Sequence, residues 1–301
     1  MIKSFLKIAL TAFVVATLAF VSLRIAPGDP VERILGPNAR MEQIQDYRER
    51  LGLNLPLTSQ YMKFLRDFVQ LNWGDSLFKN KPVLELISDA MTPTIKLALI
   101  SVLIAFILAS VIGVLAAIFR ATILDHIIRV FTLSILSFPI FSLAPILIIL
   151  FSIKLNWLPV SELNSLKHYF LPLMCLSLPM TCVLSRVIRN QYLETLHEPW
   201  IVVLKAKGMG ALAIILRIYK VCLPTVINVV SLQLSVVLAG AMITETIFDI
   251  PGLGRLLLQS LENRDYPLVQ GLIIYTSVIY LSLYAVNDYI NRKIDPRLGI
   301  E

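Results

Sequence analysis

Charged residues are scarce in this chain. Asp, Glu, Lys and Arg make up 16% of its 301 residues and hydrophobic residues make up 57%, with a mean hydropathy of +0.77. An average soluble domain contains about 25% charged residues. The shortage excludes a soluble globular protein and indicates that lipid is the solvent for most of the chain.

Motifs that carry out chemistry are also missing. No glycine is followed by lysine, so a Walker A phosphate loop cannot be built. His197 and Glu198 begin a zinc-protease pattern, but Ile201 stands where the second histidine belongs. Gly252 and Gly254 lack the third glycine of a dinucleotide-binding fold. We therefore expect a protein that is not an enzyme, with no catalytic residue, no metal site and no cofactor bound by this chain.

Uncharged apolar sequence, by contrast, is abundant. Six windows lack Asp, Glu, Lys and Arg altogether, and each is 16 to 24 residues long. A helix needs about 20 residues to cross the hydrocarbon core of a membrane. The windows are Ile8 to Leu23, Leu97 to Phe119, Val130 to Ile153, Tyr169 to Ser185, Val221 to Thr244 and Tyr266 to Asn287. They predict an all-α polytopic membrane protein with six transmembrane helices, the first retained as an anchor.

The distribution of Lys and Arg predicts the orientation of these helices. With the N-terminus in the cytoplasm, inside segments carry 13 basic residues and the short outside loops carry 4. This asymmetry accounts for the net charge of +7, so we expect no nucleic-acid partner. The chain then divides into an anchor helix (1–23), an extracytoplasmic helical segment (24–91), a five-helix core (92–290) with a cytoplasmic loop (186–220), and a tail (291–301). Both termini are cytoplasmic in this arrangement.

The three cysteines fall in or beside the apolar windows. Cys175 and Cys182 lie within the fourth window, and Cys222 lies near the inner end of the fifth. Because no cysteine lies in a predicted outside loop, we expect no extracytoplasmic disulfide framework. Their simplest role is that of small apolar residues.

Short-range patterns predict where several helices begin and pack. Asn38 and Thr58 are placed to cap two helices of the outer segment, and Thr92 with Pro93 to start the second span. Small side chains recur every four residues along that span, at Ser101, Ala105, Ala109, Gly113 and Ala117. Such a ridge favours a helix interface, within the bundle or between subunits. Kinks are predicted at Pro139, Pro145, Pro172 and Pro179.

The segment 186–220 is the largest predicted cytoplasmic feature. It mixes apolar and basic residues, as a helix that docks on a protein or on lipid headgroups requires. Gly208 and Gly210 predict a turn, because glycine destabilises a helix interior by about 1 kcal/mol.

Polar residues in and after the fifth window are unusual in an otherwise apolar span. Asn228, Gln233 and Ser235 are compatible both with a hydrated path and with hydrogen bonds between helices. Glu245 follows the window directly, and a carboxylate at that depth needs a hydrogen-bond or cation partner. Residues that favour turns follow at Pro251, Gly252 and Gly254. They predict a chain reversal, so we expect an outer gate or re-entrant turn over residues 245–256.

A series of ordered motifs resembles one known family over nearly the whole chain. The first three are Arg24-Ile25-Ala26-Pro27-Gly28-Asp29-Pro30, Leu51-Gly52-Leu53-Asn54-Leu55-Pro56 and Trp73-Gly74-Asp75-Ser76. The others are Glu245 to Leu256, Arg264-Asp265-Tyr266-Pro267 and Asp295-Pro296-Arg297. The series resembles the B-type inner-membrane permease subunits of peptide and nickel ABC importers, which have the type I (MetI-like) permease architecture.

The resemblance implies a role for the cytoplasmic loop. In that family a loop segment ending in Ala-Lys-Gly docks in a cleft of the ATPase, and Ala206-Lys207-Gly208 corresponds to it here. The implied coupling residues are Glu198, Val202, Val203, Leu204, Lys205, Ala206, Lys207 and Gly208. Val202, Val203 and Leu204 replace the Glu-Ala-Ala triplet of ABC importers and would be apolar knobs in the ATPase cleft.

The resemblance also implies partners. These are a second homologous permease in a heterodimer, two ATP-binding cassette ATPases that hold ATP and Mg, an extracytoplasmic substrate-binding protein, and the lipid of a bacterial inner membrane. ATP binding would draw the cytoplasmic loops together and turn the cavity outward. Peptide is the expected substrate, with nickel or a metal chelate as the alternative.

Two other functions compete with an ABC importer permease. An ion-coupled secondary transporter would need ionisable residues within its spans, which the six windows lack. A non-transporting scaffold would have no reason to carry an ordered docking motif.

Overall fold

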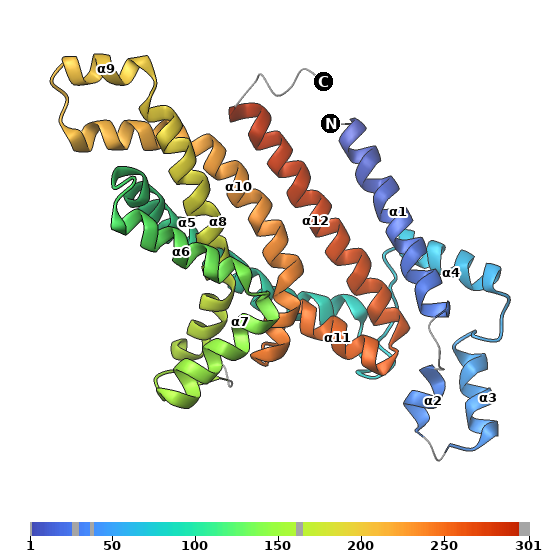
Figure 1. Ribbon diagram of the computed structural model, residues 1–301. Helices are drawn as coiled ribbons and strands as arrows, with labels where there is room; N and C mark the ends of the chain where they lie inside the picture. Colours follow the sequence, from blue (N-terminus) through green and yellow to red (C-terminus); the bar gives the residue numbers. More distant parts are fainter. Residues whose placement is uncertain (1, 26–29, 37–38, 161–164, 295–301) are drawn as a thin grey trace. The chain divides into compact units, whose positions relative to one another are not determined.

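The computed structural model describes residues 2–25, 30–36, 39–160 and 165–294, and its regular elements there are helices (Figure 1). The expected cap Asn38, the motif residues 26–29 and the tail residues 295–301 lie outside the described residues. The helices in chain order are α1 (Ile2–Ile25), α2 (Pro30–Leu35), α3 (Met41–Arg50), α4 (Leu57–Val69), α5 (Val83–Ile118), α6 (Ile123–Ser137), α7 (Ile140–Leu147), the π-helix η1 (Ile148–Lys154), the 3-10 helix η2 (Leu166–Tyr169), α8 (Phe170–Leu196), α9 (Pro199–Ala206), α10 (Ala211–Ile247), α11 (Leu253–Asn263) and α12 (Tyr266–Ile294).

The membrane-spanning helices confirm the all-α polytopic class. Among the described residues, α5, α8 with η2, α10 and α12 each contain a stretch long and apolar enough to cross a membrane. The third predicted window is divided, because α6 and the α7–η1 run are bent by 112° from one another. The apolar part of α1, Leu10–Ile25, is shorter than these spans. The count of six transmembrane helices is therefore not fully confirmed.

The bend in the third window has a visible cause. Pro139 is the N-cap of α7 and lies between the two arms, so the kink expected there is confirmed. A proline cannot donate a helix hydrogen bond, and its ring clashes with the preceding turn. Pro179 has a milder effect, since α8 continues through it as one helix.

The chain forms two compact units. One consists of Met1–Thr94 and Pro251–Ser282, and the other consists of Ile95–Ile250 and Leu283–Glu301. This division follows packing within the chain. The division by side of the membrane, with segments 1–23, 24–91, 92–290 and 291–301, stays a prediction.

In the second unit, α8 packs against α6, α7 and α10. The small-residue ridge of α5 is buried as well, since Ser101, Ala105 and Ala109 are fully buried, and its Gly113 lies against α8. A Cβ atom added at Gly113 would lie 2.7 Å from the Ser185 carbonyl oxygen and 2.8 Å from the Ile188 Cβ. The expected helix interface is confirmed, and it lies within this chain.

In the first unit, α5 begins at Val83 and not at the predicted cap Thr92. The extra turns are stabilised by tertiary packing, because Val83 and Ile87 are buried in one cluster with Leu268 and Leu272. Burial of this apolar face outweighs the hydrogen bond that Pro93 removes from the helix. The predicted start at Thr92 was therefore wrong.

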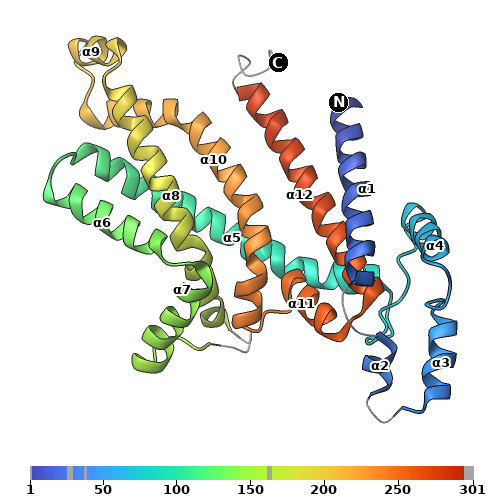
Figure 2. The same ribbon diagram turned by 45° about the vertical axis from the view of Figure 1, so that its right-hand side comes forward.

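The outer segment contains two of the expected helices, with different caps. The N-cap of α3 is Arg40, and α4 begins at Leu57 with Pro56 as its N-cap, so Thr58 is not a cap. Figure 2 shows α4 beside α1. The hydroxyls of Thr17 and Tyr61 are 2.8 Å apart across this contact.

Candidate coupling loop and outer motif

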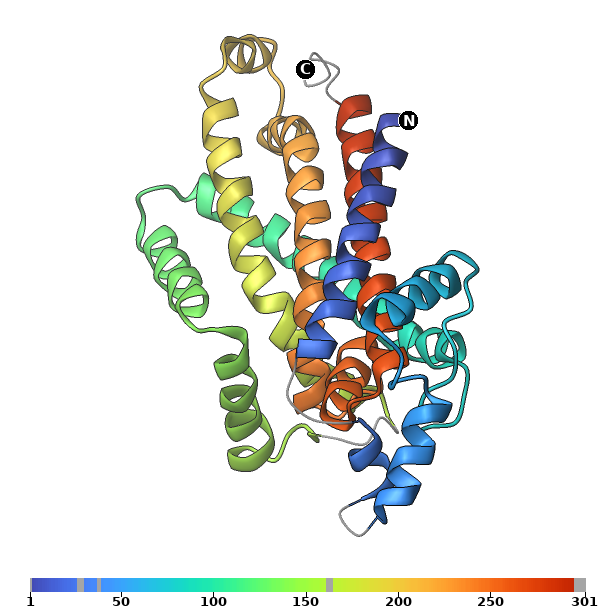
Figure 3. The same ribbon diagram turned by 90° about the vertical axis from the view of Figure 1, so that its right-hand side faces the viewer.

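The expected docking element is a short helix of its own. Helix α9 lies beyond the ends of α8 and α10, as Figure 3 shows. Glu198 is its N-cap in extended conformation, with φ −67° and ψ 139°, and Pro199 occupies the first turn. Proline is favoured there because its fixed φ suits the helix and its missing N–H would be unpaired anyway.

Gly208 ends this helix in the way the sequence predicted. Its φ is +76°, a left-handed conformation that glycine adopts without a Cβ penalty. The Gly208 N–H donates to the Lys205 carbonyl at 3.0 Å, and the Met209 N–H donates to the Leu204 carbonyl at 3.2 Å. These two bonds form a Schellman motif, which satisfies the last carbonyls of the helix. A turn at Gly208 that presents a short helix is confirmed.

The two faces of α9 differ sharply. Ile201 is only 1% exposed, and Leu204 packs partly buried against the same core of the second unit. Val202 and Val203 are 68% and 52% exposed, respectively. The structure thus divides the predicted apolar triplet, because helical periodicity turns Leu204 toward the core and leaves the two valines outside. Lys205, Ala206 and Lys207 are also exposed.

A buried carboxylate near the same end of α8 escaped the sequence analysis. Asp125 on α6 is 1% exposed and accepts two hydrogen bonds from Arg189 on α8, both 2.9 Å long. Arg129 donates to it at 3.0 Å, and the Ala121 N–H at 3.1 Å. The fork of Arg189 matches both carboxylate oxygens, so this Asp125 clamp fixes α6 on α8. The i,i+4 spacing of Asp125 and Arg129 was the only sequence signal.

The outer motif forms a tight link between α10 and α11. Glu245 is fully buried in the last turns of α10, and the Ile250 N–H donates to its backbone carbonyl at 2.8 Å. The left-handed residue is Asp249, with φ +58°, whereas Gly252 is extended as the N-cap of α11. A turn is confirmed in this segment, but the glycines are not its positive-φ positions. Aspartate tolerates this conformation better than most residues do.

The two glycines of this motif lie at the start of α11. Gly252 is the residue before the helix, and Gly254 lies in its first turn. The boundary between the two compact units falls between Ile250 and Pro251, inside the motif. A gating role for the motif stays a prediction.

The three polar candidates of the fifth span do not share one face of α10. Asn228 and Ser235 are seven residues apart and so lie on the same side, whereas Gln233 points roughly 140° away. The Ser235 hydroxyl donates to the carbonyl of Ser231 at 3.4 Å, within its own helix. A role for these residues in the translocation pathway stays a prediction.

The three cysteines, Cys175, Cys182 and Cys222, are buried and are not joined in disulfides. No group of three or more His, Cys, Asp or Glu side chains within the described residues could hold a metal ion.

Long apolar helices and a short exposed helix are features of a polytopic membrane protein, and comparison with known proteins identifies its family. The family model described as "Binding-protein-dependent transport system inner membrane component" matches residues 109–300, and the model for the N-terminal part of such components matches residues 1–98. The chain belongs to this family of ABC transporter permease subunits.

Two relatives show how far the similarity extends. The chain is 33% identical over 288 residues to the "Probable peptide ABC transporter permease protein y4tP" of Sinorhizobium fredii, covering 93% of this chain and 92% of the relative. It is also 33% identical over 299 residues to the "Glutathione transport system permease protein GsiC" of Escherichia coli (strain K12), covering 99% and 97%.

Proposed function

We propose that this permease subunit forms half of the translocation pathway of an importer for short peptides. The observation that carries the proposal is the similarity over nearly the whole chain to relatives named as peptide and glutathione permeases. Glutathione is itself a tripeptide, so both names describe molecules with amide bonds and a free carboxylate. A nickel or metal-chelate importer is the alternative substrate class.

The energy for transport enters through a partner in this proposal. Val202 and Val203 on α9 insert into a cleft of an ATPase subunit, and Lys205 and Lys207 orient the contact from its rim. Closure of two ATPases around ATP and Mg moves α9, and α8 carries that motion toward the pathway. A second permease, a substrate-binding protein and a bacterial inner membrane complete the assembly.

The test is reconstitution of the chain with its co-expressed partners in proteoliposomes. We expect ATP-dependent uptake of a labelled di- or tripeptide and no uptake of nickel or of a nickel chelate. The matched control is a complex whose ATPase subunits lack the catalytic glutamate. Uptake of nickel without peptide would contradict the substrate class, and uptake driven by an ion gradient alone would contradict the importer class.

A further inference from the structure

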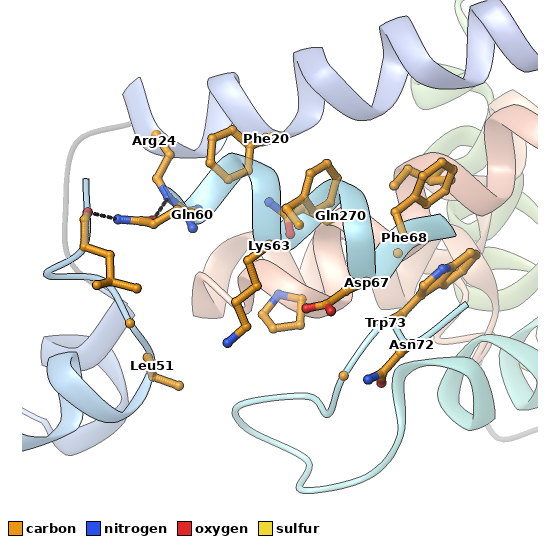
Figure 4. Close-up of a pocket in the computed structure, with 17 residues that line it drawn as sticks. Phe20, Arg24, Leu51, Gln60, Lys63, Asp67, Phe68, Asn72, Trp73 and Gln270 are labelled. Carbon is orange, nitrogen blue, oxygen red and sulfur yellow. Dashed lines mark hydrogen bonds between the residues drawn. The ribbon is translucent and has the colours of Figure 1, made fainter. Parts of the chain in front are cut away.

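The first unit contains a cavity of about 450 Å³ that is lined by residues outside α9 and outside the outer motif. Ligand sites in proteins commonly have volumes of about 300–1,000 Å³. Its walls come from the end of α1, the loop before α4, α4 itself, the loop before α5 and the start of α12 (Figure 4). The lining residues thus come from distant parts of the chain that all belong to one compact unit.

Arg24 is held rigidly in the wall of this cavity. Its Nε donates to Gln60 Oε1 at 3.0 Å, and Gln60 in turn donates to the carbonyls of Leu53 and Leu55 at 3.1 and 2.9 Å. The guanidinium also lies 4.7 Å from the ring centroids of Phe20 and Tyr266. A cation fixed in this way is preorganised for a planar anion such as a carboxylate.

Three N–H donors of the lining have no acceptor. They are Nη1 of Arg24, Nε1 of Trp73 and Nε2 of Gln270, and they account for three of the five unpaired buried side-chain polar atoms in the described part of the chain. Gln270 is only 9% exposed. Buried donors are normally paired, so three of them around one cavity indicate a ligand that supplies several acceptors.

The order of these donors favours an elongated ligand. Figure 4 shows Gln270 between Arg24 and Trp73 along the cavity. Phe64 and Phe68 line it as well, and their ring centroids are 6.4 Å apart. A ligand that fits has a carboxylate at one end, further carbonyl oxygens along its length and an apolar side group.

The exposed side of the lining distinguishes such a ligand from a lipid. Lys63 and Asp67 bring opposite charges to the cavity, and Asn72 adds a polar amide. These side chains suit a molecule with charged groups at both ends. The acyl chains of a phospholipid would have to leave the cavity across the same polar side chains, at the expense of their solvation.

We propose that this cavity binds the carboxylate end of a short peptide. The carboxylate accepts hydrogen bonds from Arg24, and amide carbonyls accept from Gln270 and Trp73. An apolar side group packs against Phe64 and Phe68. For its substrate class the inference rests on the proposed function, and it adds a binding site separate from α9 and the outer motif.

The test compares a peptide acid with its amide on the full-length purified chain in nanodiscs. Equilibrium dialysis uses radiolabelled alanyl-phenylalanine and alanyl-phenylalanine amide as probes. We expect the acid to bind about tenfold more tightly, because only the acid offers an ionised partner to Arg24. The Arg24→Gln variant should lose this difference, whereas Gln270→Leu should weaken acid and amide alike.

Matched variants keep the test independent of folding. Arg66→Gln changes an exposed arginine of α4 outside the cavity lining and should bind like the unmodified chain. If Arg24→Gln does not fold, Arg24→Lys keeps the charge without the planar fork, and it should retain a weaker preference for the acid. Circular dichroism of each variant checks the helical fold.

Three results would overturn the inference. The first is equal binding of acid and amide, and the second is binding that neither Arg24→Gln nor Gln270→Leu changes. The third is a phospholipid retained in native mass spectra, lost in Arg24→Gln and not displaced by the peptide acid. Water alone in the cavity would give the first result, with no measurable affinity for either probe.

The inference and the proposed function fail separately. If the reconstituted complex takes up peptides but the purified chain shows no preference for the acid, only the cavity site is wrong. If the purified chain prefers the acid but the complex shows no ATP-dependent peptide uptake, the proposed function is wrong and the site remains.

Discussion

Two glycines of this chain are required for different physical reasons. Gly208 is needed for its backbone conformation, since its φ is +76° and no atom lies within 4 Å of an added Cβ. Gly113 is needed for space, since an added Cβ would be 2.7 Å from a backbone oxygen of α8. Their substitutions should therefore disturb coupling and helix packing, respectively.

Replacing Gly208 with valine should uncouple the chain from its ATPase. A left-handed conformation is disfavoured by about 1–2 kcal/mol for residues with a Cβ, and more for β-branched ones. We expect normal membrane insertion, weaker recovery of the ATPase and loss of uptake. Gly210→Val is the control, because Gly210 has φ −64° and open space around it. Normal uptake by Gly208→Val would remove the coupling role from this turn.

Replacing Gly113 with alanine should separate α5 from α8. Overpacking against the backbone of Ser185 destabilises a protein by about 1–3 kcal/mol. The free energy of unfolding in a detergent titration should fall by this amount. Val111→Ala, at an exposed position of the same helix, should change it by less than about 1 kcal/mol. Equal stability of the two variants would contradict the close approach of the helices.

At the scale of elements, the Asp125 clamp joins α6 to α8. Removing the carboxylate in Asp125→Ala leaves Arg189 without its partner, and loss of one member of a buried pair costs about 3–5 kcal/mol. Arg129 is 49% exposed, so Arg129→Gln should lower the free energy of unfolding by less than about 1 kcal/mol. Detergent-unfolding titrations of both variants measure the difference. Similar losses for both would show that the pair with Arg189 is not dominant.

Helix α9 should lose its partner when its outward face becomes charged. Val203→Asp places a carboxylate on the exposed face without disturbing Ile201, which anchors the helix in the core. We expect unchanged stability of the purified chain and at least a tenfold weaker association with the ATPase, because a charge would be buried unpaired. Ile123→Asp, at an exposed position of α6 outside the coupling residues, measures the effect of an added charge alone. Pull-down of the ATPase with tagged permease measures the association of each variant.

Some of these elements could be predicted from the sequence and others could not. The apolar windows and the turn at Gly208 follow from local composition, so both were found. The first helical residue of α5 was predicted ten residues too late, at Pro93, because Val83 and Ile87 pack against residues of α12. Local capping signals carry no information on such contacts. Asp125 was missed because Arg189 is 64 positions away in sequence.

At the scale of the whole chain, the orientation in the membrane is the main prediction left to test. The excess of basic residues in the inside segments predicts that Gln43 and Lys205 lie on opposite sides. Single cysteines at these positions, in a chain whose own cysteines are replaced by alanine, should react with an impermeant maleimide only at residue 43 in spheroplasts. Labelling of both from one side would refute the topology.

The cavity with Arg24 shows why part of a site stays hidden from the sequence. Arg24, Trp73 and Gln270 come from three separate regions, and each alone has an ordinary interpretation as a loop or interface residue. Only their common cavity and their missing acceptors distinguish them. The coupling loop was easier to predict because all its residues are contiguous.

The discontinuous first unit constrains how the protein is made. Residues 1–94 leave the ribosome long before residues 251–282, while the intervening unit is almost contiguous and can pack first. At about 5–20 residues per second, Val83 and Ile87 wait roughly 10–40 s for Leu268 and Leu272 to arrive. The bond from Ser76 to Asp265 closes only then. Chains that stall before residue 251 therefore lack the partners that bury Val83 and Ile87, so this unit cannot close until late in synthesis.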